Sequence, residues 1–488
     1  MVSNLDLLLI NVGGTKKKVY QDLSKDFSAI EPPFWAALTA GFIRNKGYNV
    51  KIIDSNAENL THGETAEIVK EHNPKLTNIV VYGQHPSAST QLMTSVGELC
   101  KEIKNIEPGR KIILTGLHPS ALPKRTIKEE NCDFVCQGEG FYTLQGLLEN
   151  SKLNNIPGLW WKENGEIINT LRAKNIGNLT SELKDVAWDL LPMHKYKAHN
   201  WQCLDDLDSR LQYASISTSL GCPFTCDFCS IQETFGERKT RNWNPSWVVE
   251  QLKILSKEYN IKNIKIIDEM FILNPNHFMK IAKGIIKEDL DLNIWAYARV
   301  DTIKENHLDT LKKAGFNWLC LGYEAGSDKV REDVHKGKFT REDMIQNRKI
   351  IGKHGINILA NYVFGFPEET KESMQETLDL AIELNCEFAN LYCNTAWPGS
   401  NLYNNTIQNN VEVPKTWVDY AQHSYNFLPL PTKHLSPREV LEFRDNAFDN
   451  YFKNPEYLKM VGSKFGPKTK EHIENMTKTK LKRKLLGD

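Results

Sequence analysis

The sequence predicts an α/β protein: a Rossmann-like, doubly wound parallel sheet, then a partial (β/α)6 barrel of the TIM type, then a small, mainly helical region. Two observations carry this prediction. Short apolar runs alternate with amphipathic stretches along residues 5–150, and the alternation resumes from 214 to about 400. Alternating strand and helix patterns favour parallel sheets covered by helices. We expect four parts: 1–150 (doubly wound domain), 151–210 (linker with a small hairpin), 211–400 (partial barrel) and 401–488 (helical region).

Five apolar runs supply the expected strands of the first sheet. Amphipathic segments at 34–43 and 92–99 lie between them and predict helices. Farther along the chain, an Asn-Gly pair at 164–165 between two β-rich runs predicts a tight hairpin turn. The expected strands of the sheet are 7–12, 50–54, 78–82, 111–115 and 133–136.

The loops after these strands hold candidate binding residues, because doubly wound sheets bind ligands beyond the carboxyl ends of their strands. Glycine allows close approach to a ligand, and His or Glu supplies a polar contact. For any one loop, ordinary turn formation is the simpler interpretation. The candidates in the three loops are Gln84, His85, Gly116, His118, Gly138 and Glu139.

The second alternating region predicts six strands at 216–219, 264–267, 294–298, 318–322, 358–364 and 388–393. In such barrels the chemistry gathers at the carboxyl ends of the strands. A lone carboxylate there is more often a helix cap than a ligand, but polar residues that follow successive strands in order indicate a shared site. These residues are Asp268, Glu269, Arg299, Glu324, Ser327, Gly365 and Glu368.

The first of these strands leads into the most specific motif, Cys222-x3-Cys226-x2-Cys229. Three thiolates on one loop can each bind one iron of an iron–sulfur cluster and leave a further iron open. The alternatives are a zinc knuckle or three buried thiols. Zinc normally takes four ligands from paired motifs, and no second C-x2-C or H-x3-H pair follows. The spacing therefore favours an iron–sulfur cluster.

The bulk composition narrows the class of protein. The 61 basic and 61 acidic residues balance, so no overall field favours nucleic acid or an anionic membrane. No apolar run approaches the roughly 20 residues that span a bilayer. The N-terminus has no basic segment before its first apolar stretch, and exposed cluster thiolates suit a reducing compartment. We expect a cytoplasmic protein that does not enter a membrane.

The cysteine motif and the strand-end residues resemble those of the radical S-adenosylmethionine enzymes. The resemblance implies a 4Fe–4S cluster on Cys222, Cys226 and Cys229, whose open iron binds S-adenosylmethionine and whose electron yields a 5′-deoxyadenosyl radical. It also implies S-adenosylmethionine contacts. Asp268 and Glu269 would meet its amine, Arg299 its carboxylate, Glu324 and Ser327 its ribose, and Phe228, Gly365 and Glu368 its adenine.

Residues 1–150 resemble the cobalamin-binding domain of one large subfamily of these enzymes. The matching residues include Pro32-Pro33, Asp54, Gly116-x-His118 and Gly138-Glu139-Gly140. The D-x-H-x-x-G motif that supplies a histidine ligand in other cobalamin proteins is absent. Many members of the subfamily also lack it, so the resemblance implies cobalamin held without a histidine ligand.

The subfamily resemblance implies cobalamin-dependent methylation of an unactivated carbon on a small molecule. It also implies a reductase or flavodoxin-type electron donor. The alternatives are a radical cyclase or rearrangement enzyme, with or without cobalamin, an RNA methylthiotransferase, and a non-catalytic metal-binding protein. A methylthiotransferase would carry a second cysteine triple, and Cys100, Cys132 and Cys136 lack its spacing. The sequence identifies neither the substrate nor a residue that acts on it.

Overall fold

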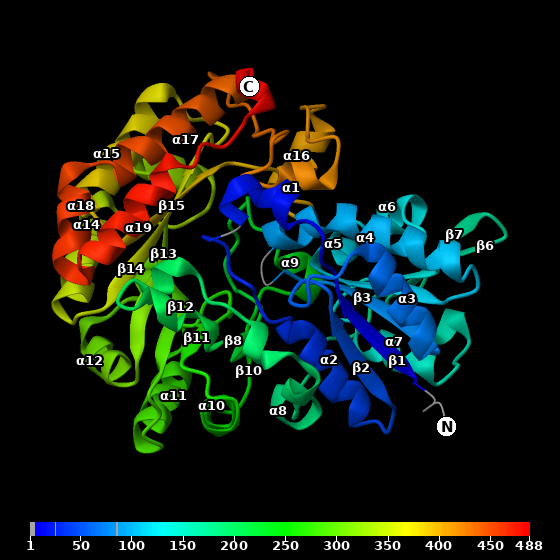
Figure 1. The fold of residues 1–488 in the computed structure, drawn as a ribbon. Coiled ribbons are helices and arrows are strands. Elements are labelled where there is room, and N and C mark those ends of the chain that lie inside the picture. The colour runs from blue at the N-terminus through cyan, green and yellow to red at the C-terminus, as the bar shows by residue number, and fades with distance from the viewer. Residues whose placement is uncertain (1–4, 25, 84–85) are drawn as a thin grey trace.

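The computed structural model describes residues 5–24, 26–83 and 86–488, and within them the chain forms two main sheets side by side (Figure 1). Gln84 and His85, two of the expected binding residues, lie outside the described part. The first sheet has the strand order β2-β1-β3-β4-β5-β6-β7. Its strands are β1 (Leu7–Asn11), β2 (Val50–Asp54), β3 (Leu76–Val81), β4 (Ile112–Gly116), β5 (Phe134–Cys136), β6 (Leu159–Glu163) and β7 (Glu166–Asn169).

The first five strands are parallel, which confirms the doubly wound prediction. The chain order reverses between β1 and β3, and ligands of doubly wound sheets bind at the carboxyl ends of the strands beside such a switch point. The hairpin expected within the linker pairs antiparallel with β5 and extends the sheet instead. The helices of this part are α1 (Lys16–Tyr20), α2 (Phe34–Arg44), α3 (His62–His72), α4 (Pro86–Ile106), α5 (Leu117–Ala121), α6 (Pro123–Glu129), α7 (Phe141–Leu148) and α8 (Leu179–Glu182).

The second sheet is parallel throughout, with the strand order β15-β14-β13-β12-β11-β8, and it confirms the partial six-stranded barrel. Its strands are β8 (Tyr213–Ile216), β11 (Asn263–Ile266), β12 (Asn293–Ala298), β13 (Phe316–Glu324), β14 (Asn357–Phe364) and β15 (Phe388–Cys393). Its helices are α9 (Gln232–Phe235), α10 (Pro245–Glu258), α11 (Pro275–Lys287), α12 (Glu305–Lys313), α13 (Asp328–Asp333), α14 (Arg341–Lys353) and α15 (Lys371–Leu384).

The first barrel strand ends at Ile216, so the expected strand at 216–219 was placed too late. The backbone N–H of Thr218 leaves the ladder and donates to the Asp268 carboxylate. Beyond it the chain forms β9 (Ser219–Leu220), which pairs antiparallel with β10 (Arg241–Asn242). This short pair brackets the cysteine loop.

The C-terminal region is helical, as expected, and packs against the barrel (Figure 1). Its helices are α16 (Asn401–Gln408), α17 (Pro437–Phe452), α18 (Pro455–Phe465) and α19 (Pro467–Lys478). The Ser436 hydroxyl accepts from the Glu439 backbone at the start of α17, while the Glu439 carboxylate bonds the Ser436 N–H, which forms a capping box. Helix α17 lies against β15, the last strand of the open barrel.

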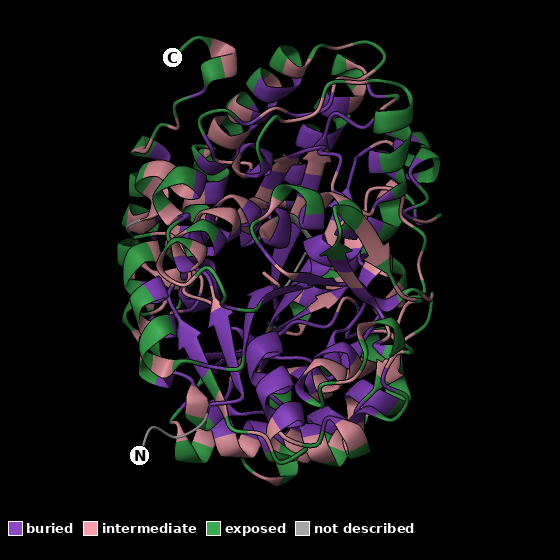
Figure 2. Ribbon diagram, turned by 90° about the vertical axis from the view of Figure 1, so that its right-hand side faces the viewer, coloured by how far each residue is buried: buried purple, intermediate pink, exposed green. Residues whose placement is uncertain are grey.

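Buried residues concentrate in the strands of both sheets and in the helix faces between them (Figure 2). One continuous apolar cluster contains Leu7 of β1, Ile264 of β11 and Ile473 of α19. The two sheets and the C-terminal helices therefore share a core, which fixes their mutual position. No helix in the described residues is long and apolar enough to cross a membrane.

Candidate active site

The three cysteines lie on the loop between β9 and α9, at the carboxyl end of the barrel. All three thiols are free and partly exposed. Burial raises the pKa of Cys222 to about 11 and that of Cys229 to about 12, and the neighbouring thiols add to both shifts. Three thiols within electrostatic reach of one another disfavour the thiolate form unless positive charge compensates it. This arrangement fits a metal cluster.

The three thiols do not form a ready-made site for a single metal ion. Among the described residues, no three His, Cys, Asp or Glu side chains converge as the ligands of one ion. In an iron–sulfur cluster each cysteine binds a different iron, which is the arrangement that the cysteine motif predicts.

Asp268 and Glu269 follow β11 but have different environments. The Asp268 carboxylate accepts from the Thr218 N–H (2.5 Å) and hydroxyl (2.6 Å) and from the Ser219 hydroxyl (2.7 Å). It therefore anchors the start of the cysteine loop and has little capacity for a ligand. Glu269 accepts one bond, from the Gly221 N–H at 3.2 Å, and burial raises its pKa to about 8. Of the pair, Glu269 is the carboxyl suited to bind a ligand ammonium group.

Arg299 lies beside the cysteine loop, but its guanidinium already forms a bidentate ion pair with another residue of the chain. Its Nε and Nη2 each donate to Asp301 at 2.9 Å. The remaining Nη1 is 4.0 Å from the Cys226 sulfur, and the guanidinium stacks 3.7 Å from the centre of the Phe224 ring. Arg299 thus places a fixed positive charge next to the Cys226 sulfur, and such a charge favours metal ligation by cysteine.

Glu324 ends β13 in a left-handed backbone conformation, with φ 62°. Its carboxylate accepts from the Lys336 ammonium at 2.7 Å, and both side chains are nearly inaccessible to solvent. Gly322 makes room for this pair, because a Cβ there would lie 2.3 Å from a Glu324 oxygen. Strained backbone of this kind often marks a functional position. Ser327, three residues on, directly precedes α13.

In the loop after β14, the side chain of Glu369 turns inward and that of Glu368 turns outward. The buried Glu369 accepts from the backbone N–H groups of Gly365 (2.7 Å) and Phe366 (2.9 Å). Glu368 lies at the surface in an ion pair with Lys433. Glu369 is not among the residues expected from the sequence, because only the path of the loop shows which of the two neighbouring glutamates is buried. The Phe228 ring packs against Phe366, with ring centres 5.5 Å apart.

The candidate residues of the first sheet that the structure describes are all buried. At Gly116 φ is 125°, and a Cβ would lie 2.2 Å from the Val81 carbonyl oxygen, so only glycine fits. His118 is buried, with Nδ1 3.1 Å from the Thr90 hydroxyl and its ring edge-on to Trp417. Burial lowers the pKa of His118 to about 3, so the ring is uncharged. His118 is a packed core residue.

Gly138 and Glu139 connect the first sheet to the cysteine loop. The Gly138 N–H donates to Ser120, whose hydroxyl donates to the Glu233 carbonyl on α9. The buried Glu139 forms an ion pair with Arg241 of β10 and accepts from the Ile176 N–H at 2.7 Å. These contacts hold the carboxyl edge of the doubly wound sheet against the segment that carries the cysteines.

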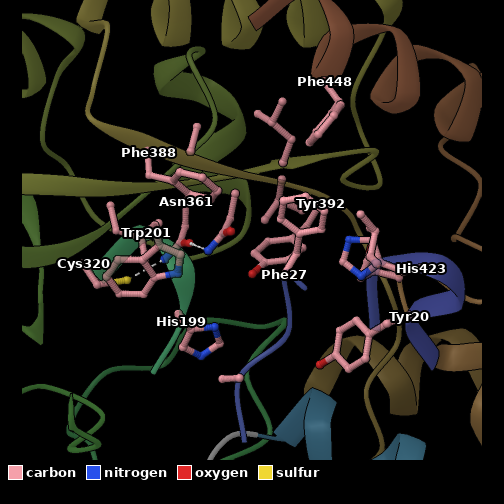
Figure 3. Close-up of a pocket in the computed structure, with 18 of the residues that line it drawn as sticks. Tyr20, Phe27, His199, Trp201, Cys320, Asn361, Phe388, Tyr392, His423 and Phe448 are labelled. Atoms are coloured by element: carbon pink, nitrogen blue, oxygen red, sulfur yellow. Dashed lines mark hydrogen bonds between the residues drawn. The ribbon is translucent and has the colours of Figure 1, made fainter. Parts of the chain in front are cut away.

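A cavity of about 430 Å³ runs through the barrel interior and reaches Phe228 on the cysteine loop. Figure 3 shows side chains from the N-terminal segment, the barrel strands and α17 directed into this space. Glu269, Arg299 and Glu324 do not line it. The lining residues come from segments more than 400 positions apart, such as those of Tyr20 and His423, which sequence patterns do not bring together.

Comparisons with known proteins agree with this fold. The Radical SAM superfamily model matches residues 216–381, and the B12 binding domain model matches residues 22–148. An uncharacterised methyltransferase of Pyrococcus horikoshii is 32% identical over 432 residues, which cover 88% of this chain and 89% of that protein. The anaerobic magnesium-protoporphyrin IX monomethyl ester cyclase of Cereibacter sphaeroides is 25% identical over 86% of this chain and 66% of that protein.

Two solved structures share the whole fold. The radical S-adenosylmethionine methyltransferase TsrM from Kitasatospora setae has a TM-score of 0.71 at 15% identity. The match covers 97% of this chain and 99% of the TsrM chain. The cobalamin-dependent radical enzyme OxsB has a TM-score of 0.70 at 15% identity, over 98% of this chain and 71% of its own.

The fold and site thus define a radical enzyme with a B12-type domain. The chain belongs to the radical S-adenosylmethionine superfamily, in the branch that carries an N-terminal B12-binding domain. The cofactors of this branch are a 4Fe–4S cluster, S-adenosylmethionine and cobalamin.

Proposed function

We propose that this enzyme transfers a methyl group from cobalamin to an unactivated carbon of a small molecule, with S-adenosylmethionine as radical source and methyl donor. The observation that carries the proposal is the contact between the B12-type sheet and the cysteine loop, the two regions expected to hold cofactors. Ser120 and Glu139, at the carboxyl edge of the B12-type sheet, bond Glu233 and Arg241, which flank the cysteine loop. Both cofactors would therefore face one reaction space. The methyltransferase names of the relatives support the same reaction.

The chain's own residues would position the cofactors and exclude water. Cys222, Cys226 and Cys229 would hold the cluster, and Glu269 would receive the ammonium of S-adenosylmethionine. Lys336 compensates the buried Glu324 carboxylate, and the remaining acceptor capacity of that carboxylate suits ribose hydroxyls. Gly116 keeps the ends of β3 and β4 close together, which shapes the sheet edge where a corrin ring would lie. When bound, the cofactors supply hydrogen abstraction and methyl delivery.

The partners follow from this chemistry. We infer a small-molecule substrate, since the cavity lies inside the barrel, and a reductase or flavodoxin-type protein as electron donor. The reductive chemistry suits the cytoplasm. A radical cyclase is the second candidate, because the Cereibacter sphaeroides relative is named as one.

Cofactor retention tests the proposal. The full-length protein is purified without oxygen, reconstituted with iron and sulfide, incubated with hydroxocobalamin, desalted and analysed for iron, sulfide and cobalamin. We expect about four irons and one cobalamin per chain, with cobalamin kept and iron lost when the three cysteines are changed to alanine. Iron without cobalamin would contradict methyl transfer.

Product analysis separates the two candidates. Methyl transfer predicts S-adenosylhomocysteine beside 5′-deoxyadenosine when S-adenosylmethionine and a low-potential reductant are added. A cyclase or rearrangement enzyme would form 5′-deoxyadenosine alone. Neither product, in protein that retains both cofactors, would contradict both functions under these conditions.

A further inference from the structure

The barrel cavity has walls that are largely aromatic. Rings from the N-terminal segment, the barrel strands and α17 line it on several sides, as Figure 3 shows for Phe27, Tyr392 and Phe448. Aromatic faces bind flat, apolar ligands through offset stacking and area burial. The rings that define the walls are Phe27, Trp201, Trp295, Tyr297, Tyr392 and Phe448.

The charged groups of the lining are basic, and they share their acidic partners. Among the described residues that line the cavity, none is an aspartate or glutamate. Glu31 is shared by Lys265 and His199, at 3.0 and 2.8 Å, and Asp445 is shared by Arg444 and Arg483, at 2.7 and 3.0 Å. Burial, with smaller contributions from Arg444 and Arg483, lowers the pKa of His423 to about 3, so this ring is neutral. A cationic ligand would lose its hydration without gaining a free carboxylate as countercharge.

Several neutral polar groups remain for hydrogen bonds. Within the described part of the chain, the hydroxyls of Tyr297 and Tyr392 bond no other residue. The Asn390 amide donates to Asn361 at 2.9 Å, and Asn361 donates to the Cys320 sulfur at 3.0 Å, which forms a polar ledge across three strands. Figure 3 shows Asn361 and Tyr392 among the residues that face the cavity. Phenol and amide groups of this kind orient a neutral ligand through its oxygen or nitrogen atoms.

We propose that this cavity is the substrate site and that it takes a planar and largely apolar molecule without positive charge, bearing a hydroxyl, carbonyl or amide group. The inference rests on the proposed function, because the cavity reaches Phe228 on the cysteine loop. Aromatic faces supply the affinity, and Tyr392 and Asn390 orient the polar group. The basic lining, whose acidic partners are already shared, excludes cationic analogues of the same shape.

A charge series of one ring system tests the inference without turnover. Three probes are titrated into the anaerobically reconstituted full-length protein: 2-naphthol, 2-naphthoate and 2-naphthylmethylamine, with binding followed by calorimetry. We expect 2-naphthol and 2-naphthoate each to bind at least about tenfold more tightly than 2-naphthylmethylamine, a difference of about 1.4 kcal/mol. Absence of 2-naphthol binding, or equal or tighter binding of the cationic probe, would overturn the inference.

Variants locate the site within the barrel. Tyr392→Phe removes only a hydroxyl, and Asn390→Leu removes the amide at similar volume. Each should weaken 2-naphthol about three- to tenfold and leave 2-methylnaphthalene unchanged. Asn404→Leu, on the exposed face of α16, is the matched control and should not change either probe. If Asn390→Leu does not fold, Tyr392→Phe alone still shows whether 2-naphthol binds in this cavity. Unchanged 2-naphthol affinity in a folded Tyr392→Phe protein places the probe elsewhere and overturns the assignment.

The same samples distinguish this inference from the proposed function. Iron and cobalamin contents are measured on each preparation before the titration. Selective 2-naphthol binding in protein that retains no cobalamin would contradict methyl transfer and leave the cavity assignment intact. Full cofactor retention without selective probe binding would contradict the cavity assignment and leave the proposed methyl transfer intact.

Discussion

The Asp268 carboxylate accepts hydrogen bonds from both the backbone N–H and the hydroxyl of Thr218, at 2.5 and 2.6 Å. Thr218 lies between the first barrel strand and the short strand that begins the cysteine loop. The buried Asp268 therefore determines where the barrel strand ends and where the loop starts. The resemblance implies that Asp268 contacts S-adenosylmethionine, but in this structure its carboxylate accepts hydrogen bonds from the chain itself.

The first prediction concerns this anchor. Asp268→Asn keeps the side-chain volume but removes the charge that strengthens three hydrogen bonds. We expect a loss of about 1–3 kcal/mol in the free energy of unfolding and a lower iron content after reconstitution. Urea titration and iron analysis measure the two effects. Asp291→Asn, at an exposed ion pair with Lys262, is the control and should change neither. Wild-type stability and iron content in Asp268→Asn would contradict the anchoring role.

The second prediction compares neighbouring glutamates. Glu369→Ala leaves the N–H groups of Gly365 and Phe366 without their buried acceptor, so we expect a loss of about 2–3 kcal/mol at pH 8. Glu368→Ala removes only a surface ion pair and should change stability by less than about 0.5 kcal/mol. Denaturant titration measures stability, and equilibrium dialysis measures S-adenosylmethionine binding.

Binding measurements on the two variants show which glutamate matters for S-adenosylmethionine: the buried Glu369 or the exposed Glu368. We expect Glu369→Ala to weaken S-adenosylmethionine binding through the displaced loop, and Glu368→Ala to leave it near the wild-type value. A larger effect of Glu368→Ala on S-adenosylmethionine binding would show that Glu368 contacts the ligand, as the sequence leads us to expect.

The glutamate pair also illustrates what a sequence can and cannot predict. The cysteine motif and the strand alternation were readable because both are local patterns, set by ligand spacing and by apolar periodicity. Which of Glu368 and Glu369 turns inward depends on the path of one loop. The burial of His118 depends on Trp417, nearly 300 residues later, and the barrel cavity depends on side chains from both ends of the chain. Such contacts are tertiary and leave no local pattern.

The third prediction is a pH dependence of stability from Glu130. Burial, with a smaller contribution from Glu129, raises the pKa of Glu130 from 4.5 to about 7. The folded state therefore holds this proton more tightly than the unfolded state, and stability falls as the pH rises from 4.5 to 7. Glu130→Gln removes the penalty of ionisation. We expect it to stabilise the protein by about 2 kcal/mol at pH 8 and by little at pH 5.

Thermal unfolding at the two pH values measures this difference. Glu163→Gln, on the exposed β6 strand end, is the control and should shift the melting temperature little at either pH. A stabilisation by Glu130→Gln that is equal at pH 5 and pH 8 would show that ionisation is not its cause.

The last prediction concerns the close approach at the end of β4. Gly116→Ala would place a methyl group 2.2 Å from the Val81 carbonyl oxygen at a φ of 125°. Backbone strain and overpacking together should lower the free energy of unfolding by about 2–4 kcal/mol. Gly109→Ala is the matched control, because its Cβ would meet nothing within 4 Å and its φ lies outside the left-handed range. Denaturant titration of both variants, with cobalamin retention measured on the folded fraction, tests the geometry of this edge. A Gly116→Ala protein as stable as the Gly109→Ala protein would show that the two strands separate easily, and the edge would then be too adaptable to define a corrin-binding surface.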